Sequence, residues 1–535
     1  MSTNITREKR EILIQKVNAI KDHINSSPLD ENTNALLTYL ADIENELRSK
    51  KFGLVFEEHR EGIDEKLENN LPFLAEDADL FVNNGGEMNF LLEGDNLASL
   101  NLLLKTHKGK IDLIYIDPPY NTGNKDFIYD DSFVDSTDSF RHSKWLSFME
   151  KRLKLARKLL SDNGVIFISI DDNEQAELKL LCDSVFGELN FVATFVWETK
   201  KEAKGIPPVK MCVPNQEYIF AYSKGNKFKF VGDKRNVEDG FKNPDNDPRG
   251  PWKRQYLQRF GQGFSVRTIV NPENGMEFSF ETPYTEEKMN KWIQEGVIIF
   301  PKSIDKFPAR KEYFLEYNNP YKPVVTSLGL YSTKVNSEKL KELFNSQKVF
   351  DYTKPTQLIE DIIKKSINAD ATILDFFAGS GTTGHAVMKL NAEDGGKRKF
   401  ILCTNNENDI ARDVTYERIK RVIAKENYKA SLKYFKVNFL PISDRLYYEY
   451  ADELLEHIRE LVELENAIDF KSNKEFAIIL TDEELETFVK NIPTECKKVY
   501  LGHNVLLSED AETEFTKKNI AINIIPEYYY TEEAF

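Results

Sequence analysis

Four consecutive residues, Asp117-Pro118-Pro119-Tyr120, carry the clearest chemical signal in this sequence. They directly follow the apolar run 111–116, which predicts a buried strand. The two prolines make the next corner rigid and remove two N–H donors from it, but they keep their carbonyl acceptors. A carboxylate and a fixed carbonyl can together accept hydrogen bonds from the two N–H groups of an amino group, and an aromatic ring can stack on a flat heterocycle. We therefore predict that residues 117–120 form a catalytic corner.

The reaction that suits this corner is the transfer of a methyl group to the exocyclic amino group of a nucleic-acid base. Such an amine is a poor nucleophile because its lone pair is delocalised into the ring. Asp117 and the carbonyl of Pro118 can accept hydrogen bonds from its two N–H groups and draw the nitrogen towards tetrahedral geometry. Tyr120 can stack on the flipped base. If the donor is a sulfonium, the step is an in-line transfer that depends on positioning more than on a strong base.

A glycine-rich loop, residues 375–383, is the second chemical signal. It follows a predicted strand at 372–374 and leads into a helix near Gly384. Its glycines permit positive φ angles and a close approach of a ligand, and the helix N-terminus favours a carboxylate or phosphate. We interpret the loop as a binding site for S-adenosylmethionine, a sulfonium methyl donor. The loop residues that we predict to bind this cofactor are Asp375, Phe377, Gly379, Gly381 and Thr382.

Two other interpretations of the loop stay open. Gly379, Gly381 and Gly384 also fit the G-x-G-x-x-G spacing of dinucleotide-binding proteins, and the same glycines could form a tight turn that binds nothing. An NAD-dependent oxidoreductase is disfavoured because no His, Tyr-x-x-x-Lys or acid is placed for hydride transfer. An acid about twenty residues beyond such a loop is placed to bind ribose hydroxyls. Glu407 is our candidate for that contact, and Asn406 is the second choice.

Strand and helix patterns alternate around both signals. Alternation of this kind predicts an α/β fold, here a doubly wound, Rossmann-like sheet that is mostly parallel. The predicted strands lie at 90–92, 111–116, 165–170, 191–197, 217–222, 372–374 and 400–403. The predicted helices lie at 138–160, 356–367, from 384 onwards and at 409–425.

The chain divides into four predicted parts. Helical spacing of apolar residues predicts a helical N-terminal segment, residues 1–85, that acts as a cap or a dimerisation element. The sheet domain is split into residues 86–200 and 346–428. Between its halves, residues 201–345 lose the alternation and predict an inserted domain of irregular β structure. Residues 429–535 predict a small α/β C-terminal domain.

The composition is that of a soluble globular protein, and 535 residues are enough for several domains. The formal net charge of −16 disfavours a nucleic-acid partner, because phosphate binding depends on Lys and Arg, but a local positive groove would be sufficient. No apolar run is long enough to cross a membrane, and the N-terminus does not look like a signal peptide. The scattered cysteines show neither metal-ligand nor disulfide spacing, so we expect reduced thiols and a cytoplasmic location.

The catalytic corner and the string Phe377-Ala378-Gly379-Ser380-Gly381 together resemble the amino-group DNA methyltransferases. The corner precedes the glycine loop, which is the motif order of the β class. The resemblance implies S-adenosylmethionine as cofactor, double-stranded DNA with a flipped base as substrate, and, from Asp rather than Ser at the corner, methylation of adenine at N6. It also implies that Asp95 contacts the cofactor adenine, that Asp117 borders the cofactor and that Lys354 belongs to the segment closing over its methionine end.

The resemblance extends to the modification subunits of type III restriction–modification systems. It rests on the strings 117–123, 168–174 and 245–252. It implies a site-specific enzyme, and we also expect a homodimer and a helicase–nuclease partner subunit. The alternatives are a solitary adenine methyltransferase, an RNA base or protein methyltransferase, and a binding module with an inactive cofactor fold. Thr404-Asn405-Asn406 stands where many relatives have an acid, so this chain departs from the family pattern at the expected ribose contact.

The inserted domain is the expected reader of the DNA sequence. Its basic residues alternate with aromatic ones, a mixture suited to phosphate contact and base stacking, although a solvated loop over a core of aromatics would look similar. The predicted DNA-binding residues are Lys200, Lys201, Lys253, Arg254, Arg259, Arg267 and Arg310, and Lys204 and Lys210 lie in the same basic stretch.

No metal site is predicted. The pair Asp171-Asp172 follows a predicted strand and resembles a paired-carboxylate site, but we interpret it as a turn. His142 is expected on the surface, and His385 is expected to pack or cap rather than to catalyse.

Overall fold

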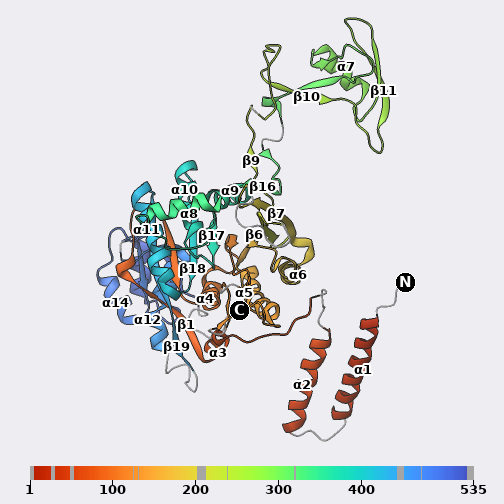
Figure 1. Ribbon diagram of the computed structural model, residues 1–535. Coiled ribbons are helices and arrows are strands. Elements are labelled where there is room, and N and C mark those ends of the chain that lie inside the picture. The colour runs from red at the N-terminus through yellow and green to blue at the C-terminus, as the bar shows by residue number, and fades with distance from the viewer. Residues whose placement is uncertain are drawn as a thin grey trace.

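The computed structural model describes residues 5–25, 31–48, 54–123, 126–129, 132–201, 212–237, 239–317, 321–442, 451–471 and 473–526. Within these residues, a ten-stranded sheet with the order β1-β19-β2-β18-β17-β3-β6-β8-β7-β16 forms the centre of the molecule (Figure 1). Its strands are β1 (Asn70–Glu76), β2 (Glu87–Glu93), β3 (Ile111–Ile116), β6 (Leu160–Ile170), β7 (Phe191–Glu198), β8 (Gln216–Ser223), β16 (Ser327–Leu330), β17 (Thr372–Asp375), β18 (Lys399–Thr404) and β19 (Ala430–Pro441).

The middle of this sheet is parallel. The strands from β19 through β2, β18, β17 and β3 to β6 all run in one direction, and β1 and β8 pair antiparallel at either side of them. From β3 the chain proceeds to β6 on one side, and from β17 it proceeds to β18 on the other. The neighbouring pair β3 and β17 is therefore the point where the winding changes direction, and ligands of such sheets bind outside the carboxyl ends of those strands. The predicted doubly wound α/β fold is confirmed.

Helices cover both faces of the sheet. Along β3, Ile114 and Ile116 join the apolar core on one face, whereas Leu113 and Tyr115 join the core on the other, as the alternation of side chains along a strand requires. The first core includes α4 (Asn96–His107), α5 (Arg141–Leu159) and α6 (Gln175–Phe186). The second includes α9 (Thr356–Ser366), α10 (Thr382–Asp394) and α11 (Glu417–Glu426).

A separate lobe projects from one end of the sheet (Figure 1). It has an apolar core of its own, which includes Trp252, Phe280 and Trp292. Its elements are β10 (Trp252–Tyr256), β11 (Ser265–Val270), β12 (Glu277–Thr282), α7 (Glu286–Gln294), β13 (Ile298–Ile299), β14 (Ala309–Tyr313) and the 3₁₀ turn η3 (Phe314–Glu316). The short antiparallel pair β9 (Asp233–Lys234) and β15 (Tyr321–Lys322) lies between the lobe and the sheet.

A buried ion cluster fastens the lobe together. Asp247 accepts hydrogen bonds from both Nε and Nη2 of Arg249 at 3.0 Å, from Lys311 Nζ at 2.7 Å and from Tyr313 Oη at 2.7 Å. Trp252 Nε1 donates to Asp245 at 2.9 Å. The polar residues of the string 245–252 thus join β10 to β14.

The lobe is smaller than the insert predicted from the sequence. Strands β8 and β16 both lie inside the predicted range 201–345, yet both pair with β7 in the central sheet. Helix α8 (Thr333–Leu343) likewise packs near α11. The sequence Ser327-Leu328-Gly329-Leu330 of β16 is short and contains a glycine, so its local pattern gives no sign of a strand in a large sheet.

The two ends of the chain carry further elements. Helices α1 (Ile5–Asn25) and α2 (Glu31–Arg48) pack on each other and stand apart from the sheet in Figure 1. A three-stranded parallel sheet near the C-terminus consists of β20 (Phe476–Ile479), β21 (Lys498–Leu501) and β22 (Ala521–Ile524). The remaining elements are α3 (Gly62–Asn69), η1 (Ala78–Leu80), β4 (Ile128–Tyr129), β5 (Ser132–Phe133), η2 (Glu188–Asn190), η4 (Glu407–Asp409), the π-helical turn η5 (Ile410–Tyr416), α12 (Ala451–Glu456), α13 (Ile458–Asn466), α14 (Asp482–Lys490) and α15 (Glu509–Lys517). Among the described helices, none combines the length and the apolar character that a membrane span needs.

A second ion cluster ties the central sheet to the segment that follows it. Lys433 of β19 has a fully buried side chain, and its Nζ lies 2.6 Å from Glu463 Oε2 and 2.7 Å from Asp469 Oδ1. Glu76 Oε1 of β1 lies 3.5 Å from the same nitrogen. Three carboxylates, one from β1 and two from the segment after the sheet, thus share one buried ammonium group.

We predict that Lys433→Met destabilises the protein by about 3–5 kcal/mol, because it leaves buried carboxylates without their cation. Lys436→Met is the matched control on the same strand. Its Nζ is 2.9 Å from Asp77, but its side chain is 38% exposed, so its loss should cost less than about 1 kcal/mol. Urea unfolding followed by circular dichroism measures both values, and equal losses in the two variants would contradict the prediction.

Candidate functional site

The catalytic corner leaves the sheet at the carboxyl end of β3, beside the end of β17. There Lys354 Nζ lies 3.0 Å from Asp117 Oδ1 and 3.2 Å from Glu217 Oε2. Tyr120 Oη donates a hydrogen bond to the same Glu217 oxygen at 3.1 Å, and the Lys354 ammonium lies 4.8 Å from the centre of the Tyr120 ring. One cation therefore connects the carboxylate of the corner, its aromatic ring and an acid on β8.

Electrostatics fixes the protonation of two of these groups. Burial lowers the pKa of Lys354, but the charges of Asp117 and Glu217 outweigh this effect and raise the pKa above its usual value. Burial, together with the same two carboxylates, raises the pKa of Tyr120 well above its usual range. At neutral pH the site thus holds an ammonium group and a neutral phenol.

Glu217 was not identified from the sequence. It stands at the start of the apolar strand β8, where a single acid is most simply explained as a solvent-facing strand end. Only the antiparallel pairing of β8 with β6 brings it to the carboxyl end of the parallel strands. An acid at one end of a run that is otherwise buried is the signal that could have marked it.

Hydrogen bonds from neighbouring elements hold the corner in place. Trp145 Nε1 of α5 donates to the carbonyl oxygen of Pro119 at 2.7 Å. Asn121, the next residue after Tyr120, is buried at a positive φ of 55° and donates to Glu174 Oε1 at 2.5 Å. The adjacent carbonyl, that of Pro118, is the one that the sequence analysis assigns to the amino group.

The glycine-rich loop lies at the carboxyl end of β17. Gly379 and Gly381 have positive φ angles of 49° and 75°, which L-residues adopt at a cost. A Cβ atom on Gly381 would lie 3.2 Å from Thr415 Cγ2, and one on Gly379 would lie 3.3 Å from Phe350 Cζ. The conformation of the loop therefore depends on glycine at both positions.

The buried side chain of Asp375 holds this loop in place through hydrogen bonds. Its carboxylate accepts hydrogen bonds from Phe377 N at 3.0 Å and from Thr383 Oγ1 at 2.5 Å. Burial raises the pKa of Asp375 to about 7. Thr382, also expected to bind the cofactor, is buried, and its hydroxyl accepts a hydrogen bond from Arg418 Nη1 at 2.8 Å. The structure thus gives the side chains of Asp375 and Thr382 contacts within the protein.

The segment with Asp95 adjoins the same loop. Asp95 caps α4 by accepting a hydrogen bond from Leu97 N at 2.7 Å, and it stays partly exposed. Asn96 Nδ2 donates to the carbonyl of Phe376 at 3.2 Å, so the ends of β2 and β17 are in contact. The carboxyl ends of three neighbouring parallel strands thus bring acids and a glycine-rich backbone together. The carboxylates can accept hydrogen bonds from hydroxyl groups and favour a ligand with positive charge.

The two candidates for the ribose contact differ in their surroundings. Asn406 Oδ1 accepts hydrogen bonds from Ala411 N at 3.0 Å and from Arg412 N at 3.3 Å, which order the π-helical turn. Glu407 is exposed at the start of η4, directly beyond β18. Of the two side chains, that of Glu407 is the more accessible to a ligand.

The predicted DNA-binding residues fall into two groups. Lys253, Arg267 and Arg310 lie within 4 Å of the acids Glu312, Glu286 and Glu316. Lys200, Lys201, Arg254 and Arg259 are exposed. Tyr256 and Phe260 of the same lobe are 56% and 79% exposed, so the lobe presents aromatic and cationic side chains to solvent. Lys204 and Lys210 lie outside the described residues.

Comparison with known proteins identifies relatives of this chain. Residues 111–415 match the family model described as DNA methylase. The StyLTI Mod subunit of Salmonella typhimurium, a type III restriction-modification enzyme, is 38% identical over 64% of this chain and 58% of its own length. The EcoPI Mod subunit of Escherichia phage P1 is 34% identical over 63% of this chain and 61% of its length. The type II methyltransferase M.KpnI of Klebsiella pneumoniae is 35% identical over 61% of this chain and 82% of its length.

The match thus spans about three fifths of the two Mod subunits, and most of M.KpnI. The family model includes both the catalytic corner and the glycine-rich loop. Because that model covers more than half of the 535 residues, this chain belongs to the DNA methylase family.

Proposed function

We propose that this protein is a site-specific DNA methyltransferase that transfers a methyl group from S-adenosylmethionine to N6 of an adenine. The observation that carries the proposal is the position of Asp117 beside Lys354, Glu217 and Tyr120, next to the glycine-rich loop. The choice of adenine rests on Asp at the head of the corner, and the relatives named as Mod subunits and methyltransferases support the reaction class.

The cofactor pocket in this proposal lies outside the carboxyl ends of β2, β17 and β18. The backbone of Gly379 and Gly381 allows close approach, Phe377 flanks it, and Asp95 and Glu407 supply acceptors for polar groups. When bound, S-adenosylmethionine supplies a methyl group on a positively charged sulfur. A pocket bordered by carboxylates favours that charge.

The residues of the corner then act on the base. Asp117 accepts one N–H of the adenine amino group, the carbonyl of Pro118 accepts the other, and Tyr120 stacks on the flipped ring. In the structure the cation of Lys354 lies against Asp117 and Glu217. It balances two acids that would otherwise repel each other, and it leaves one oxygen of Asp117 to the incoming amine. The carboxylate of Asp117 is the nearest base for the proton that the amine releases.

The inserted lobe is the proposed reader of the recognition sequence. Exposed Arg254, Tyr256, Arg259 and Phe260 support this role, because cations contact phosphates and aromatic rings stack on bases. The residues with acid partners, such as Lys253, are better suited to holding the lobe together.

We also propose that the protein works as a homodimer in the cytoplasm, with a restriction subunit as partner. The α1–α2 pair supports the dimer, because Ile12, Ile20, Leu36, Tyr39 and Ile43 on it are between 48% and 62% exposed. Unbridged cysteines, three of them buried, fit a reducing compartment. The names of the Mod relatives support the partner subunit. The match to M.KpnI covers a larger share of that relative, 82% against 58% for the StyLTI Mod subunit, and keeps an enzyme without that subunit as the alternative.

The reaction is tested by incubating the purified protein with labelled S-adenosylmethionine and DNA and then analysing the nucleosides by mass spectrometry. The proposal expects label in N6-methyladenine. Label in N4-methylcytosine would refute the choice of base, and label in RNA with none in DNA would refute the substrate. Sequencing of the methylated DNA identifies the recognition sequence.

We predict that Asp117→Ala lowers the methylation rate at least about 100-fold, because a hydrogen-bond acceptor needed in the transition state is lost. Lys354 keeps Glu217 as its partner, so folding and the affinity for S-adenosylmethionine should change little. Asp172→Ala is the matched control, since Asp172 is an exposed acid just beyond β6 that accepts a hydrogen bond from Tyr218. Methylation kinetics and cofactor titration check both, and an active Asp117→Ala variant would refute the role of the corner.

We predict that Arg254→Ala weakens DNA binding roughly threefold to tenfold and reduces the slope of log affinity against log salt by about one, as expected for one lost phosphate contact. Lys291→Ala serves as the control, because Lys291 is an exposed lysine on α7 of the same lobe. Fluorescence anisotropy with duplex DNA at several salt concentrations measures both. If the two variants bind equally well, Arg254 is not a DNA contact.

We predict that the double variant Tyr39→Glu, Ile43→Glu is monomeric, because it places charges on the exposed apolar stripe of α2. The wild type and the control Lys16→Glu, a charge reversal at an exposed polar site of α1, should sediment at twice 62.0 kDa. Analytical ultracentrifugation distinguishes these outcomes. A monomeric wild type would remove the dimer from the proposal.

A further inference from the structure

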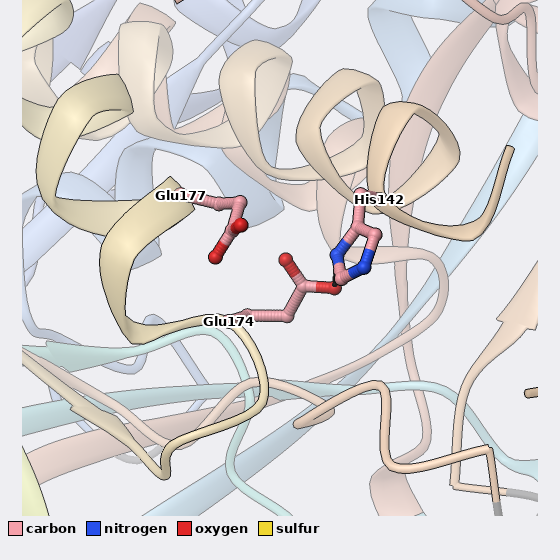
Figure 2. A group of neighbouring side chains, drawn as sticks. All are labelled: His142, Glu174 and Glu177. Carbon is pink, nitrogen blue, oxygen red and sulfur yellow. Dashed lines mark hydrogen bonds and ion pairs between the residues drawn. The ribbon is translucent and has the colours of Figure 1, made fainter.

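Three side chains with metal-ligating atoms meet beside the catalytic corner, outside the residues that act on the base. His142 comes from the first turn of α5, Glu174 is the N-cap of α6, and Glu177 lies on the first turn of α6. One ligand atom from each lies within 4.8 Å of the others. Figure 2 shows the imidazole and the two carboxylates gathered around one space between the two helix starts.

The carboxylate of Glu174 is unusual because it is fully buried and only one of its two oxygens has hydrogen-bond partners. Its Oε1 accepts hydrogen bonds from His142 Nδ1 at 2.7 Å and from Asn121 Nδ2 at 2.5 Å. Its Oε2 is buried without a hydrogen-bond partner in the part of the chain that the structure describes. In Figure 2 the second oxygen turns towards Glu177. A buried carboxylate oxygen in this position costs free energy unless a proton or a cation meets it.

We propose that His142, Glu174 and Glu177 bind a divalent transition-metal ion. The ion would take one imidazole nitrogen and one oxygen from each carboxylate, which leaves further positions for water. Two carboxylates also balance the charge of a divalent cation. A ligand set with an imidazole favours zinc, cobalt or manganese over magnesium, which prefers oxygen ligands alone.

The imidazole must change its tautomer for this binding. Arg141 Nε–H donates to His142 Nε2 at 3.2 Å, so Nδ1 carries the hydrogen that it donates to Glu174. A metal ion on Nδ1 needs the lone pair of that nitrogen, so the hydrogen moves to Nε2 and the imidazole stays neutral. Arg141 is the neighbouring positive charge that opposes the ion, and its long side chain can turn away from the ring towards solvent.

The site has a structural link to the catalytic corner. Glu174 receives the side-chain hydrogen bond of Asn121, and Asn121 directly follows Tyr120 in the chain. An ion at this place therefore joins the start of α5 to the start of α6 and holds the residue that ends the corner. This inference concerns metal binding and does not depend on which base is methylated.

Protein without a histidine tag is first dialysed against a chelator and then titrated with Zn²⁺, Co²⁺ and Mg²⁺ separately, by calorimetry. We expect one site per chain that binds Zn²⁺ and Co²⁺ more tightly than Mg²⁺, with Co²⁺ absorption bands typical of nitrogen and oxygen ligands. Glu177→Gln and His142→Gln should each weaken Zn²⁺ binding at least tenfold. The control Glu188→Gln removes an exposed carboxylate just beyond the C-terminus of α6 and should bind as the wild type does.

The same samples provide a second measurement. Zn²⁺ should raise the melting temperature of the wild type and of Glu188→Gln, and this increase should be lost in Glu177→Gln and His142→Gln. The proposal is overturned if the wild type binds none of the ions, or if both ligand variants bind Zn²⁺ as tightly as the wild type. Either result would show that His142, Glu174 and Glu177 do not form a metal site.

Discussion

The pairing of β3 with β17 is the constraint on which the rest of this structure depends. Ile373 and Leu374 pair with Leu113 and Ile114, although some 260 residues separate the two strands. The strands are parallel, so their carboxyl ends lie side by side, and the chain leaves them in opposite directions. Neither the catalytic corner nor the glycine-rich loop could form a site alone. The pairing brings two distant sequence motifs to the same edge of the sheet, and helices cover both faces of the strands.

Lys354 has a similar role on the scale of side chains. It comes from the segment before α9, and it contacts acids from β8 and from the end of β3. Two carboxylates in so small a space would raise each other's energy, and the ammonium group relieves this repulsion. Its buried position also means that the three charges are strongly coupled. The electrostatics of the site therefore depends on contributions from three separate parts of the fold.

Much of this fold follows from local patterns in the sequence. The apolar runs at 111–116, 165–170 and 191–197 predict strands that the structure contains, and the glycine-rich loop is recognisable from its glycines and its position between a strand and a helix. These features depend on neighbouring residues, so a single sequence reveals them. The DNA methylase family could likewise be inferred from two short motifs and their order.

The features that the sequence did not reveal depend on contacts between residues that are distant in the chain. The bounds of the insert were wider than those of the lobe because β8 and β16, which lie within residues 201–345, pair with β7 in the central sheet. Glu217 enters the site only through that sheet. His142, expected simply on the surface, is partly exposed but donates to a buried glutamate from another helix. Burial and charge pairing decide such roles, and neither is visible in the residue types alone.

The projecting lobe has a further consequence for how this protein can change. Its apolar core and its ion cluster around Asp247 are complete within residues 241–317, and the short β9–β15 pair lies between it and the sheet. Substitutions on the outside of the lobe therefore leave the packing of the sheet untouched. The outer surface of the lobe is therefore a part of this chain that can change its side chains without moving the strand ends of β3 and β17.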